Sequence, residues 1–343
     1  MKKLCAVIIA MILCAPNIGE CAGILHTLKS GDIIGILAPG TYAQSSDLYG
    51  GIEVLRSHGY RVKVAPSSTA IYGHFAGTDR RRAEDINSMF RDDSVKAIVC
   101  LKGGYGSART LGMLDYKMIA KHPKPFIGFS DVTALHIALA KKANIPTIHG
   151  AMLVSFTTER FISDYTTQNF FSGLTNPNPI GKIPMPEGYK LETVTPGHAE
   201  GVIIGGNLTV LTSLVGTPYE LDGKGAILFL EEVGELPYRI DRMLNQLYQN
   251  GLLRRVSGII LGDFIGCEDE DADGVNDFTL DDVLKHYARI SRKPVIKGVP
   301  AGHGKYNMFL PFGVHSVMNA NDDGSASLVI DSSLFIKTPR GYH

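Results

Sequence analysis

The amino-acid sequence predicts an α/β protein of two domains, and three observations support this. At 343 residues the chain exceeds the size of one ordinary hydrophobic core. From about residue 30 onward, short Val- and Ile-rich runs alternate with longer segments of helical spacing. Between about residues 176 and 196 the chain becomes rich in Pro and Gly, which is typical of a domain boundary.

The first half carries four predicted strands that alternate with four predicted helices. The strands are expected at residues 32–40, 60–66, 95–104 and 124–130. The helices are expected at residues 46–59, 79–92, 107–122 and 131–143. Near-continuous apolar strands separated by helices predict a parallel sheet flanked by helices, of flavodoxin or Rossmann type. Ligands of such sheets bind beyond the carboxyl ends of the strands.

The second half predicts another, smaller α/β domain. Its strands are expected at residues 200–206, 225–232, 256–264, 293–300 and 325–332. Its helices are expected at residues 207–216, 237–251 and 279–291. We therefore expect an N-terminal domain over residues 30–170, a linker over residues 171–196 and a C-terminal domain over residues 197–340.

The first 22 residues have the pattern of a secretory signal peptide. Lys2 and Lys3 precede an apolar run of about a dozen residues, and small and polar residues follow. Because that run is short for a membrane span, we expect cleavage and a periplasmic or secreted protein, with an uncleaved anchor as the alternative. After cleavage, the sequence predicts no stable association with a membrane.

The charge balance and the cysteines exclude several classes of protein. Lys and Arg number 34, and Asp and Glu also number 34, so the formal net charge is zero. Since Lys- and Arg-rich tracts are missing, we expect no nucleic-acid partner. Three of the five cysteines lie in the signal segment. The other two, Cys100 and Cys267, follow apolar runs and are expected to be buried thiols rather than a disulfide framework.

The stretch KPFIGFSDVTALH, residues 124–136, places Ser130 where a predicted strand turns into a helix. A serine at a helix start commonly caps it by accepting a hydrogen bond from a backbone N–H group. The same corner of an α/β sheet can instead hold a serine nucleophile above the sheet edge. Taken alone, the stretch favours the cap.

A cluster of glycines follows the neighbouring predicted strand. The stretch GGYGS, residues 103–107, exposes backbone N–H groups that an anion can approach closely. It lacks the spacing of the common nucleotide-binding motifs. Beside a nucleophilic serine, the N–H groups of Gly104 or Tyr105 and of Asp131 would form an oxyanion hole. Asp131 is also expected to cap the following helix with its side chain.

An acid pair and a histidine lie at predicted strand ends in the second half. Glu231 and Glu232 close an apolar strand, and His303 lies between glycines in a turn after another strand. A carboxylate and a histidine so placed could orient and activate a serine of the other domain. The alternative for His303 is a loop residue bonded only to backbone.

Six blocks of the sequence together resemble the LD-carboxypeptidase family of serine peptidases, whose relatives include the microcin C immunity proteins. In chain order, the blocks are GGYGS, IGFSDVTALH, IIGGNLTVL, LFLEEVGELPYRIDRML, GDFIGC and GHGKYNMFLPFG. The resemblance runs from about Gly31 to Ile330, which is nearly the whole chain after the signal segment. The resemblance implies a catalytic triad of Ser130, Glu231 and His303, with Glu232 as the alternative acid.

The resemblance also implies a reaction. Family members release the terminal D-alanine of murein tetrapeptides by cutting its amide to a meso-diaminopimelate or L-lysine centre, in peptidoglycan turnover or recycling. Ser130 would attack the carbonyl, His303 would transfer the proton and Glu231 would fix the imidazole tautomer. Position 132 is Val, where α/β-hydrolases have Gly, so a nucleophile corner of another fold is expected. This chemistry needs no cofactor and no metal.

Several alternatives stay open at this point. Asn207 either caps a helix or contacts substrate. The acidic stretch 269–282 begins like a calcium loop, but Leu280 occupies its twelfth position, where a glutamate is expected. Relatives suggest a homodimer, and they are commonly cytoplasmic, which conflicts with the signal segment.

Two rival functions also follow from the sequence. One is an immunity-type hydrolase of microcin C-like aminoacyl-nucleotide antibiotics; relatives of that kind often stack the base on a Trp, and this chain has none. The other is a non-catalytic periplasmic binding protein that uses the glycine-rich turn alone.

Overall fold

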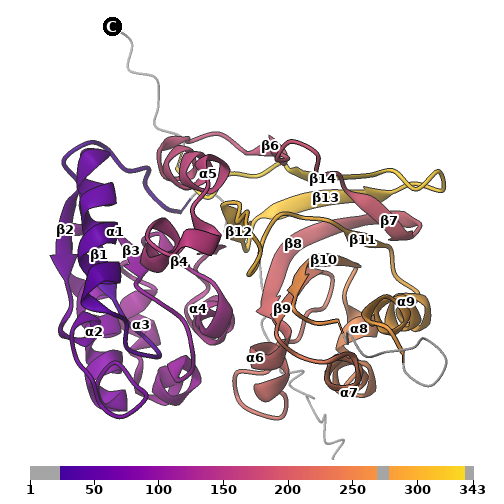
Figure 1. The fold of residues 1–343 in the computed structure, drawn as a ribbon, viewed down its shortest axis with the longest axis horizontal. Helices are drawn as coiled ribbons and strands as arrows, with labels where there is room; N and C mark the ends of the chain where they lie inside the picture. The colour runs from indigo at the N-terminus through magenta and orange to yellow at the C-terminus, as the bar shows by residue number, and fades with distance from the viewer. Residues whose placement is uncertain (1–23, 269–277, 337–343) are drawn as a thin grey trace, which may run out of the picture.

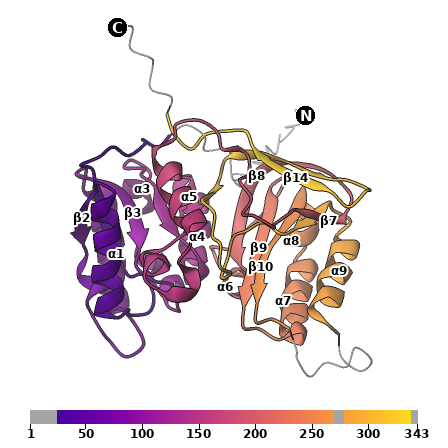
Figure 2. The ribbon, with the colours of Figure 1, turned by 45° about the horizontal axis from the view of Figure 1, so that its top comes forward.

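The structure, a computed structural model, describes residues 24–268 and 278–336 of the chain. Two β-sheets lie side by side in this part, each flanked by helices (Figure 1 and Figure 2). The α/β class expected from the sequence is therefore confirmed. The predicted signal segment and residues 269–277 of the acidic stretch lie outside the described residues.

The first sheet has six strands in the order β12-β5-β4-β3-β1-β2. Its parallel strands are β1 (Ile33–Leu37), β2 (Arg61–Val64), β3 (Val95–Cys100), β4 (Phe126–Gly128) and β5 (Thr147–His149). At the edge, β12 (Leu310–Phe312) runs antiparallel to β5. The parallel part has the strand order of flavodoxin-like sheets, in which ligands bind at the carboxyl ends of the strands.

Five α-helices and several 3₁₀ helices surround this sheet. The α-helices are α1 (Ser45–Ser57), α2 (Asp79–Arg91), α3 (Tyr116–Ile119), α4 (Thr133–Ala143) and α5 (Asp164–Thr175). The 3₁₀ helices are η1 (Pro66–Ser68), η2 (Ser107–Met113), η3 (Ser130–Val132), η4 (Leu153–Phe156) and η5 (Glu159–Phe161).

The single helix predicted over residues 107–122 was wrong. The chain forms η2, becomes extended at Leu114 and then begins the short helix α3. Asp115 starts α3 because its side chain accepts a hydrogen bond from the Met118 N–H at 3.0 Å. A cap inside an apparently continuous helical pattern therefore divides it into two elements.

The second sheet has eight strands in the order β6-β14-β13-β8-β9-β10-β11-β7. The strands β8, β9, β10 and β11 are parallel, and antiparallel strands complete both sides. The bounds are β6 (Gly181–Lys182), β7 (Glu192–Thr195), β8 (Gly197–Asn207), β9 (Ile227–Val233), β10 (Gly258–Ile265), β11 (Val295–Lys297), β13 (His315–Ala320) and β14 (Ala326–Ile330).

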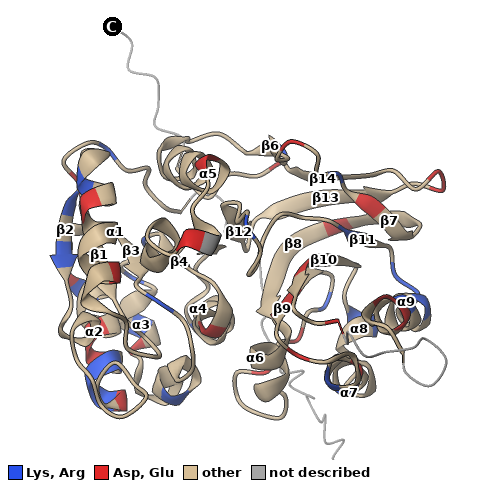
Figure 3. Ribbon diagram, in the orientation of Figure 1, with Lys and Arg blue, Asp and Glu red and all other residues tan. Residues whose placement is uncertain are grey.

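Four helices accompany the second sheet. They are α6 (Leu208–Ser213), α7 (Pro237–Gln249), α8 (Leu252–Arg255) and α9 (Leu280–Ser291). Helices α7 and α9 lie side by side next to the parallel strands (Figure 1). Acidic and basic residues are mixed along outer helices such as α2 and α9 (Figure 3), in keeping with the balanced net charge.

The chain exchanges segments between the expected domains. β12 comes from the second half of the sequence but completes the first sheet. Residues 171–196, expected as a linker, contribute the strands β6 and β7 to the second sheet. The second half of the chain is therefore tied to the first sheet by the backbone hydrogen bonds between β12 and β5.

A cluster of buried rings packs the two sheets against each other. His149 of the first sheet lies 4.9 Å from Phe229 of the second and 5.9 Å from Phe129, measured between ring centroids. His149 is fully buried, and burial lowers its pKa well below the ordinary value, so the ring stays neutral. His149 therefore packs in the buried contact between the two sheets.

The two cysteines outside the signal segment behave as expected. Cys100 and Cys267 are both buried and free. Within residues 24–268 and 278–336, no helix combines the length and the apolar character that a membrane crossing requires.

Candidate active site

Ser130 lies in a sharp corner between β4 and α4. Its φ is +63°, a left-handed conformation that costs a residue with a side chain about 1–2 kcal/mol. Neither η3 nor α4 has a side-chain cap hydrogen bond, so the interpretation of Ser130 as a helix cap was wrong. The corner is tight, because a Cβ at Gly128 would lie 2.9 Å from the methyl groups of Val132. Glycine before the serine therefore makes room for the valine after it.

Ser130, His303 and Glu231 form a continuous chain of hydrogen bonds across the two sheets. The His303 Nε2 lies 2.9 Å from the Ser130 Oγ, and the His303 Nδ1 lies 2.7 Å from the Glu231 Oε2. Glu231 is fully buried and His303 is 8% exposed. With Nδ1–H donating to the carboxylate, Nε2 is left to accept the serine proton. The three side chains proposed from the sequence are thus brought together, and His303 is not bonded only to backbone.

Glu232 points away from this chain of hydrogen bonds. Its carboxylate accepts hydrogen bonds from the Asn207 Nδ2 at 2.9 Å and from the Thr209 N–H at 2.8 Å. Neighbours on a strand face opposite sides, so only one residue of the acid pair can reach His303. Of the two alternatives, the structure places Glu231 in contact with the imidazole.

Asn207 is a helix cap in the structure. Its Oδ1 accepts a hydrogen bond from the Val210 N–H at 3.1 Å at the start of α6, and its Nδ2 is used by Glu232. Asn207 is 4% exposed. Its side chain is thus committed to the protein rather than presented beside Ser130, and contact with substrate stays a prediction.

Gly103 borders the nucleophile directly. A Cβ at this position would lie 3.0 Å from the Ser130 Cβ, 3.3 Å from the Ser130 Oγ and 3.3 Å from the Asp131 nitrogen. Glycine at 103 therefore keeps open a space that the hydroxyl and a backbone N–H both border. Gly103 belongs to the glycine cluster of the sequence, but its own role is visible only in the folded chain.

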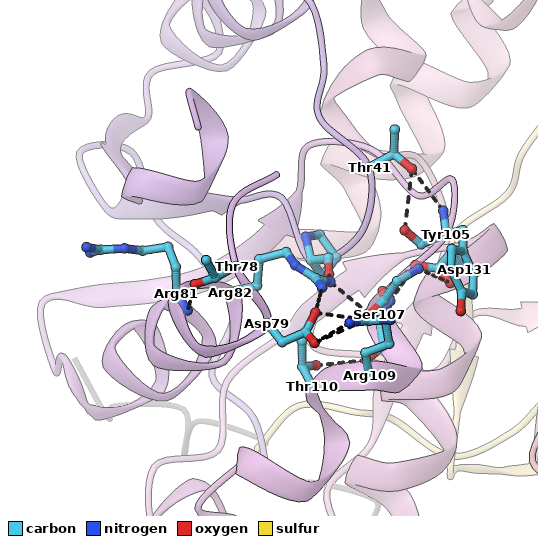
Figure 4. Close-up of polar contacts among 12 residues, drawn as sticks. Thr41, Thr78, Asp79, Arg81, Arg82, Tyr105, Ser107, Arg109, Thr110 and Asp131 are labelled. Carbon is cyan, nitrogen blue, oxygen red and sulfur yellow. Dashed lines mark hydrogen bonds and ion pairs between the residues drawn. The ribbon is translucent and has the colours of Figure 1, made fainter. Parts of the chain in front are cut away.

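The backbone N–H groups of Gly104 and Tyr105 differ in whether a protein group already accepts their hydrogen bond. The Tyr105 N–H donates to the Thr41 Oγ1 at 3.0 Å and is not available to an anion (Figure 4). Among the described residues, neither the Gly104 N–H nor the Asp131 N–H donates a hydrogen bond. Gly104 has a φ of +88°, which glycine adopts readily. Gly104 and Asp131 are therefore the better pair for an oxyanion hole.

The Asp131 side chain does not cap the following helix, so that expectation was wrong. Its Oδ2 instead accepts hydrogen bonds from the Ser107 N–H at 2.8 Å and the Ser107 Oγ at 2.6 Å (Figure 4). Burial raises the pKa of Asp131, and these hydrogen bonds oppose the rise. The carboxylate thus anchors the glycine turn beside the nucleophile instead of the helix behind it.

Asp263 is a second carboxylate near the imidazole and was not among the site residues predicted from the sequence. Its Oδ2 accepts a hydrogen bond from the Gly304 N–H at 3.2 Å, next to His303. Burial raises the pKa of Asp263 to about 7, and the charge of Glu231 adds to the rise. Its position in the block GDFIGC, at the end of a strand, was the signal that could have indicated it.

The described residues contain no group of three or more His, Cys, Asp and Glu side chains that could hold a metal ion. The predicted calcium loop includes residues 269–277, which lie outside that part of the chain. The arrangement around Ser130 is that of a serine hydrolase: a nucleophile, a base, an acid and two backbone N–H groups.

The sequence matches two family models and resembles several known proteins. Residues 34–150 match the LD-carboxypeptidase N-terminal domain, and residues 200–318 match the LD-carboxypeptidase C-terminal domain. A protein of Bacillus subtilis (strain 168) named probable murein peptide carboxypeptidase is 34% identical over 304 residues, which cover 85% of this chain and 90% of that protein.

Two further relatives represent the two activities considered above. The crystal structure of muramoyltetrapeptide carboxypeptidase from Oxalobacter formigenes has a TM-score of 0.77 and 32% identity, and covers 88% of this chain and 99% of that one. The microcin C7 self-immunity protein MccF of Escherichia coli is 28% identical over 314 residues, covering 84% of this chain and 90% of that protein. The chain belongs to the LD-carboxypeptidase family of serine-type hydrolases.

Proposed function

We propose that the protein hydrolyses the amide bond that joins the terminal D-alanine of a murein tetrapeptide to the preceding L-centre. The observation that carries this proposal is the hydrogen-bonded chain from Ser130 through His303 to Glu231. The names of the relatives from Bacillus subtilis and Oxalobacter formigenes support murein peptides as the substrate class.

The first half of the reaction forms an ester on Ser130. Its Oγ attacks the scissile carbonyl while its proton passes to the His303 Nε2, and Glu231 stabilises the resulting imidazolium. The carbonyl oxygen becomes an oxyanion that the N–H groups of Gly104 and Asp131 can bind. The C–N bond then breaks, and His303 returns the proton to the amine of the departing D-alanine.

The second half of the reaction regenerates the enzyme. A water molecule gives a proton to the His303 Nε2 and attacks the ester carbonyl through a second tetrahedral oxyanion. The Ser130–acyl bond breaks, and the Ser130 Oγ takes the proton back from His303. The products are D-alanine and a tripeptide with a free carboxyl group.

An aminoacyl-nucleotide antibiotic is the second candidate substrate, and the similarity to MccF supports it. The lack of Trp in the chain counts against stacking of a base in the manner described for such relatives. Tyr105 could substitute, because its side chain is 54% exposed beside the glycine turn. The two substrates share the triad and differ only in what the rim of the site must accommodate.

The two candidates are separated by assaying them side by side. We expect purified protein to release D-alanine from a murein tetrapeptide faster than it cleaves a glutamyl-sulfamoyl nucleoside. Ser130→Ala should abolish D-alanine release while circular dichroism and thermal unfolding stay those of the folded protein. Full activity in that variant would refute the assignment of the nucleophile, and preferential cleavage of the nucleoside would favour the immunity-type function.

We also propose that the protein is exported, as the first 22 residues predict. Outside the inner membrane, the enzyme would trim murein or its fragments before their uptake. Cell fractionation followed by N-terminal sequencing tests this: a mature chain that starts near residue 23 in the periplasm or medium is expected. An intact Met1 on a protein confined to the cytoplasm would overturn it.

A further inference from the structure

A buried arginine joins two of the turns at the active edge of the first sheet. Arg82 belongs to α2 and is 1% exposed. Its Nη1 donates hydrogen bonds to the carbonyl of Pro39, in the turn after β1, and to the carbonyl of Gly106, in the turn after β3. Its Nη2 pairs with Asp79 (Figure 4). One guanidinium group therefore connects the loops that follow two neighbouring strands.

The turn after β3 is held from its other side by the residue that follows the nucleophile. The Gly106 N–H donates to the Asp131 Oδ1 at 3.3 Å, while the Gly106 carbonyl accepts from the Arg82 Nη1 at 2.8 Å. Ser107 adds the two hydrogen bonds to Asp131 described above. Gly106, the last glycine of the turn, is thus clamped between a buried cation and a buried carboxylate.

The clamped turn also contains the glycines nearest the nucleophile. Gly103 and Gly104 lie in the clamped turn, Gly103 against Ser130 and Gly104 with an N–H that no described residue uses. Arg82 itself lies behind the turn and is too buried to touch a substrate. A guanidinium suits this task, because its planar fork can donate to several acceptors in fixed directions.

Arg109 offers a matched comparison from the surface. It pairs with the same Asp79, with its Nη2 2.8 Å from the Asp79 Oδ2, and its side chain is 48% exposed. Both guanidinium carbons lie 5.0 Å from the centre of the Phe75 ring. The two arginines therefore share an acid and a ring, and Arg109 also interacts with the Tyr105 side chain. Of the two, Arg82 alone donates to backbone carbonyls of the turns within the described part of the chain.

We propose that Arg82 is a positioning residue for the oxyanion hole. It holds residues 103–106 so that the Gly104 N–H and the Asp131 N–H face the same point beside the Ser130 Oγ. This inference rests on the proposed serine hydrolase chemistry of the site, but not on which peptide is the natural substrate.

The first test compares Arg82→Lys with Arg109→Lys. Each variant keeps the positive charge, but one ammonium group at position 82 cannot reach both carbonyls and Asp79 in the same geometry. Since one oxyanion donor is typically worth about 10²–10³ in kcat, Arg82→Lys should lower kcat for D-alanine release about ten- to hundredfold through partial misplacement of the turn. KM should change little. Arg109→Lys should leave kcat and KM close to those of the wild type.

A second measurement separates positioning from simple loss of structure. A boronic acid analogue of the tripeptide forms a tetrahedral adduct with Ser130, whereas an uncleaved tetrapeptide binds the Ser130→Ala protein in its ground state. Arg82→Lys should weaken the boronic acid by the same factor as kcat/KM. In the Ser130→Ala background, the same change at position 82 should leave tetrapeptide binding unaltered.

Two outcomes overturn the inference. One is an Arg82→Lys protein with wild-type kcat; the other is equal weakening of the boronic acid and of the ground-state tetrapeptide. The rate at which a fluorophosphonate labels Ser130 provides a readout that is independent of the peptide substrate. If the wild type is labelled but releases no D-alanine, the proposed substrate fails, and a slower labelling of Arg82→Lys than of Arg109→Lys still supports the role of Arg82.

Discussion

The corner that holds Ser130 and the corner that holds His303 are built from opposite kinds of groups. At the first corner, glycines and backbone N–H groups surround the hydroxyl, and the one carboxylate, Asp131, is turned away to anchor a turn. At the second corner, Glu231 and Asp263 both lie against the loop that carries the imidazole.

This difference matches the charges that the proposed reaction creates. The substrate oxygen becomes negative beside the first corner, and the imidazole of His303 becomes positive beside the second. Each corner thus stabilises the charge that develops on its own side. The two sheets therefore contribute separate halves of one electrostatic arrangement, and each of the following predictions alters one half.

The largest effect is expected from the acid pair at the second corner. Glu231→Gln should lower kcat by about 10⁴-fold, because the amide no longer fixes the imidazole tautomer or stabilises its charged form. Glu232→Gln is the matched control: it should retain most of the activity but lower the unfolding temperature, since Glu232 accepts the Thr209 N–H and the Asn207 amide. Steady-state assays and thermal unfolding of both variants test this. Equal loss of activity in the two would contradict the assignment.

A smaller effect is expected at the first corner from Gly103→Ala. The added methyl group would lie 3.0 Å from the Ser130 Cβ and against the Asp131 N–H, so kcat/KM should fall about ten- to hundredfold through a disturbed oxyanion hole. Gly112→Ala is the control, because its Cβ would meet nothing within 4 Å. Unchanged kinetics in Gly103→Ala would show that this space is not used by the substrate.

The pH dependence of stability tests the second carboxylate. Asp263 has a folded pKa of about 7, above its ordinary value, so the native state binds more protons than the unfolded state between about pH 4 and pH 7. The protonated Asp263 carboxyl therefore makes its full contribution to the free energy of unfolding below about pH 4. That contribution is lost as the pH rises through 7. In Asp263→Asn the side chain does not titrate, so this loss of stability should not occur. The amide oxygen can still accept the hydrogen bond from the Gly304 N–H.

Urea unfolding at pH 5 and pH 8 measures the effect. The free energy of unfolding of Asp263→Asn relative to the wild type should rise by about 2 kcal/mol from pH 5 to pH 8. A difference between the two proteins that is the same at both pH values would contradict a protonated Asp263 in the folded state.

The smallest effect concerns the strained backbone at the nucleophile. Ser130→Gly should be more stable than Ser130→Ala by about 0.5–1 kcal/mol, because glycine relieves the cost of a positive φ but loses more entropy on folding. Both variants lack the hydroxyl and should be inactive. Urea unfolding of the pair is the measurement, and a less stable Ser130→Gly would mean that the corner is not strained.

The parts of the fold with strong local patterns were predictable from the sequence. Apolar runs and helical spacing located most strands and helices to within a few residues, because their side chains face a buried core. The helix α5 and the strands β5 and β13 were not predicted, and neither were the short edge strands β6, β7 and β12. β12 owes its existence to pairing with β5, and β6 and β7 lie in a Pro- and Gly-rich stretch whose own pattern predicts a loop.

Some residues of the candidate site were likewise predictable from the sequence and others were not. The sequence predicted Ser130, Glu231 and His303 because they lie at strand ends inside recognisable blocks. Arg82 was not, since an arginine within a charged helix reads as a surface residue, and only the folded chain shows it donating to two carbonyls. The wrong cap assigned to Asp131 has a similar cause: its partner, Ser107, is 24 positions away in the sequence.

The most direct test of the account is the position of covalent modification after complete inactivation by a peptidyl phosphonate. We predict one phosphonyl group per chain, located on Ser130 by mass spectrometry, with D-alanine release lost in proportion to the labelling. Inactivation with the label on another residue, or full activity with Ser130 modified, would contradict it.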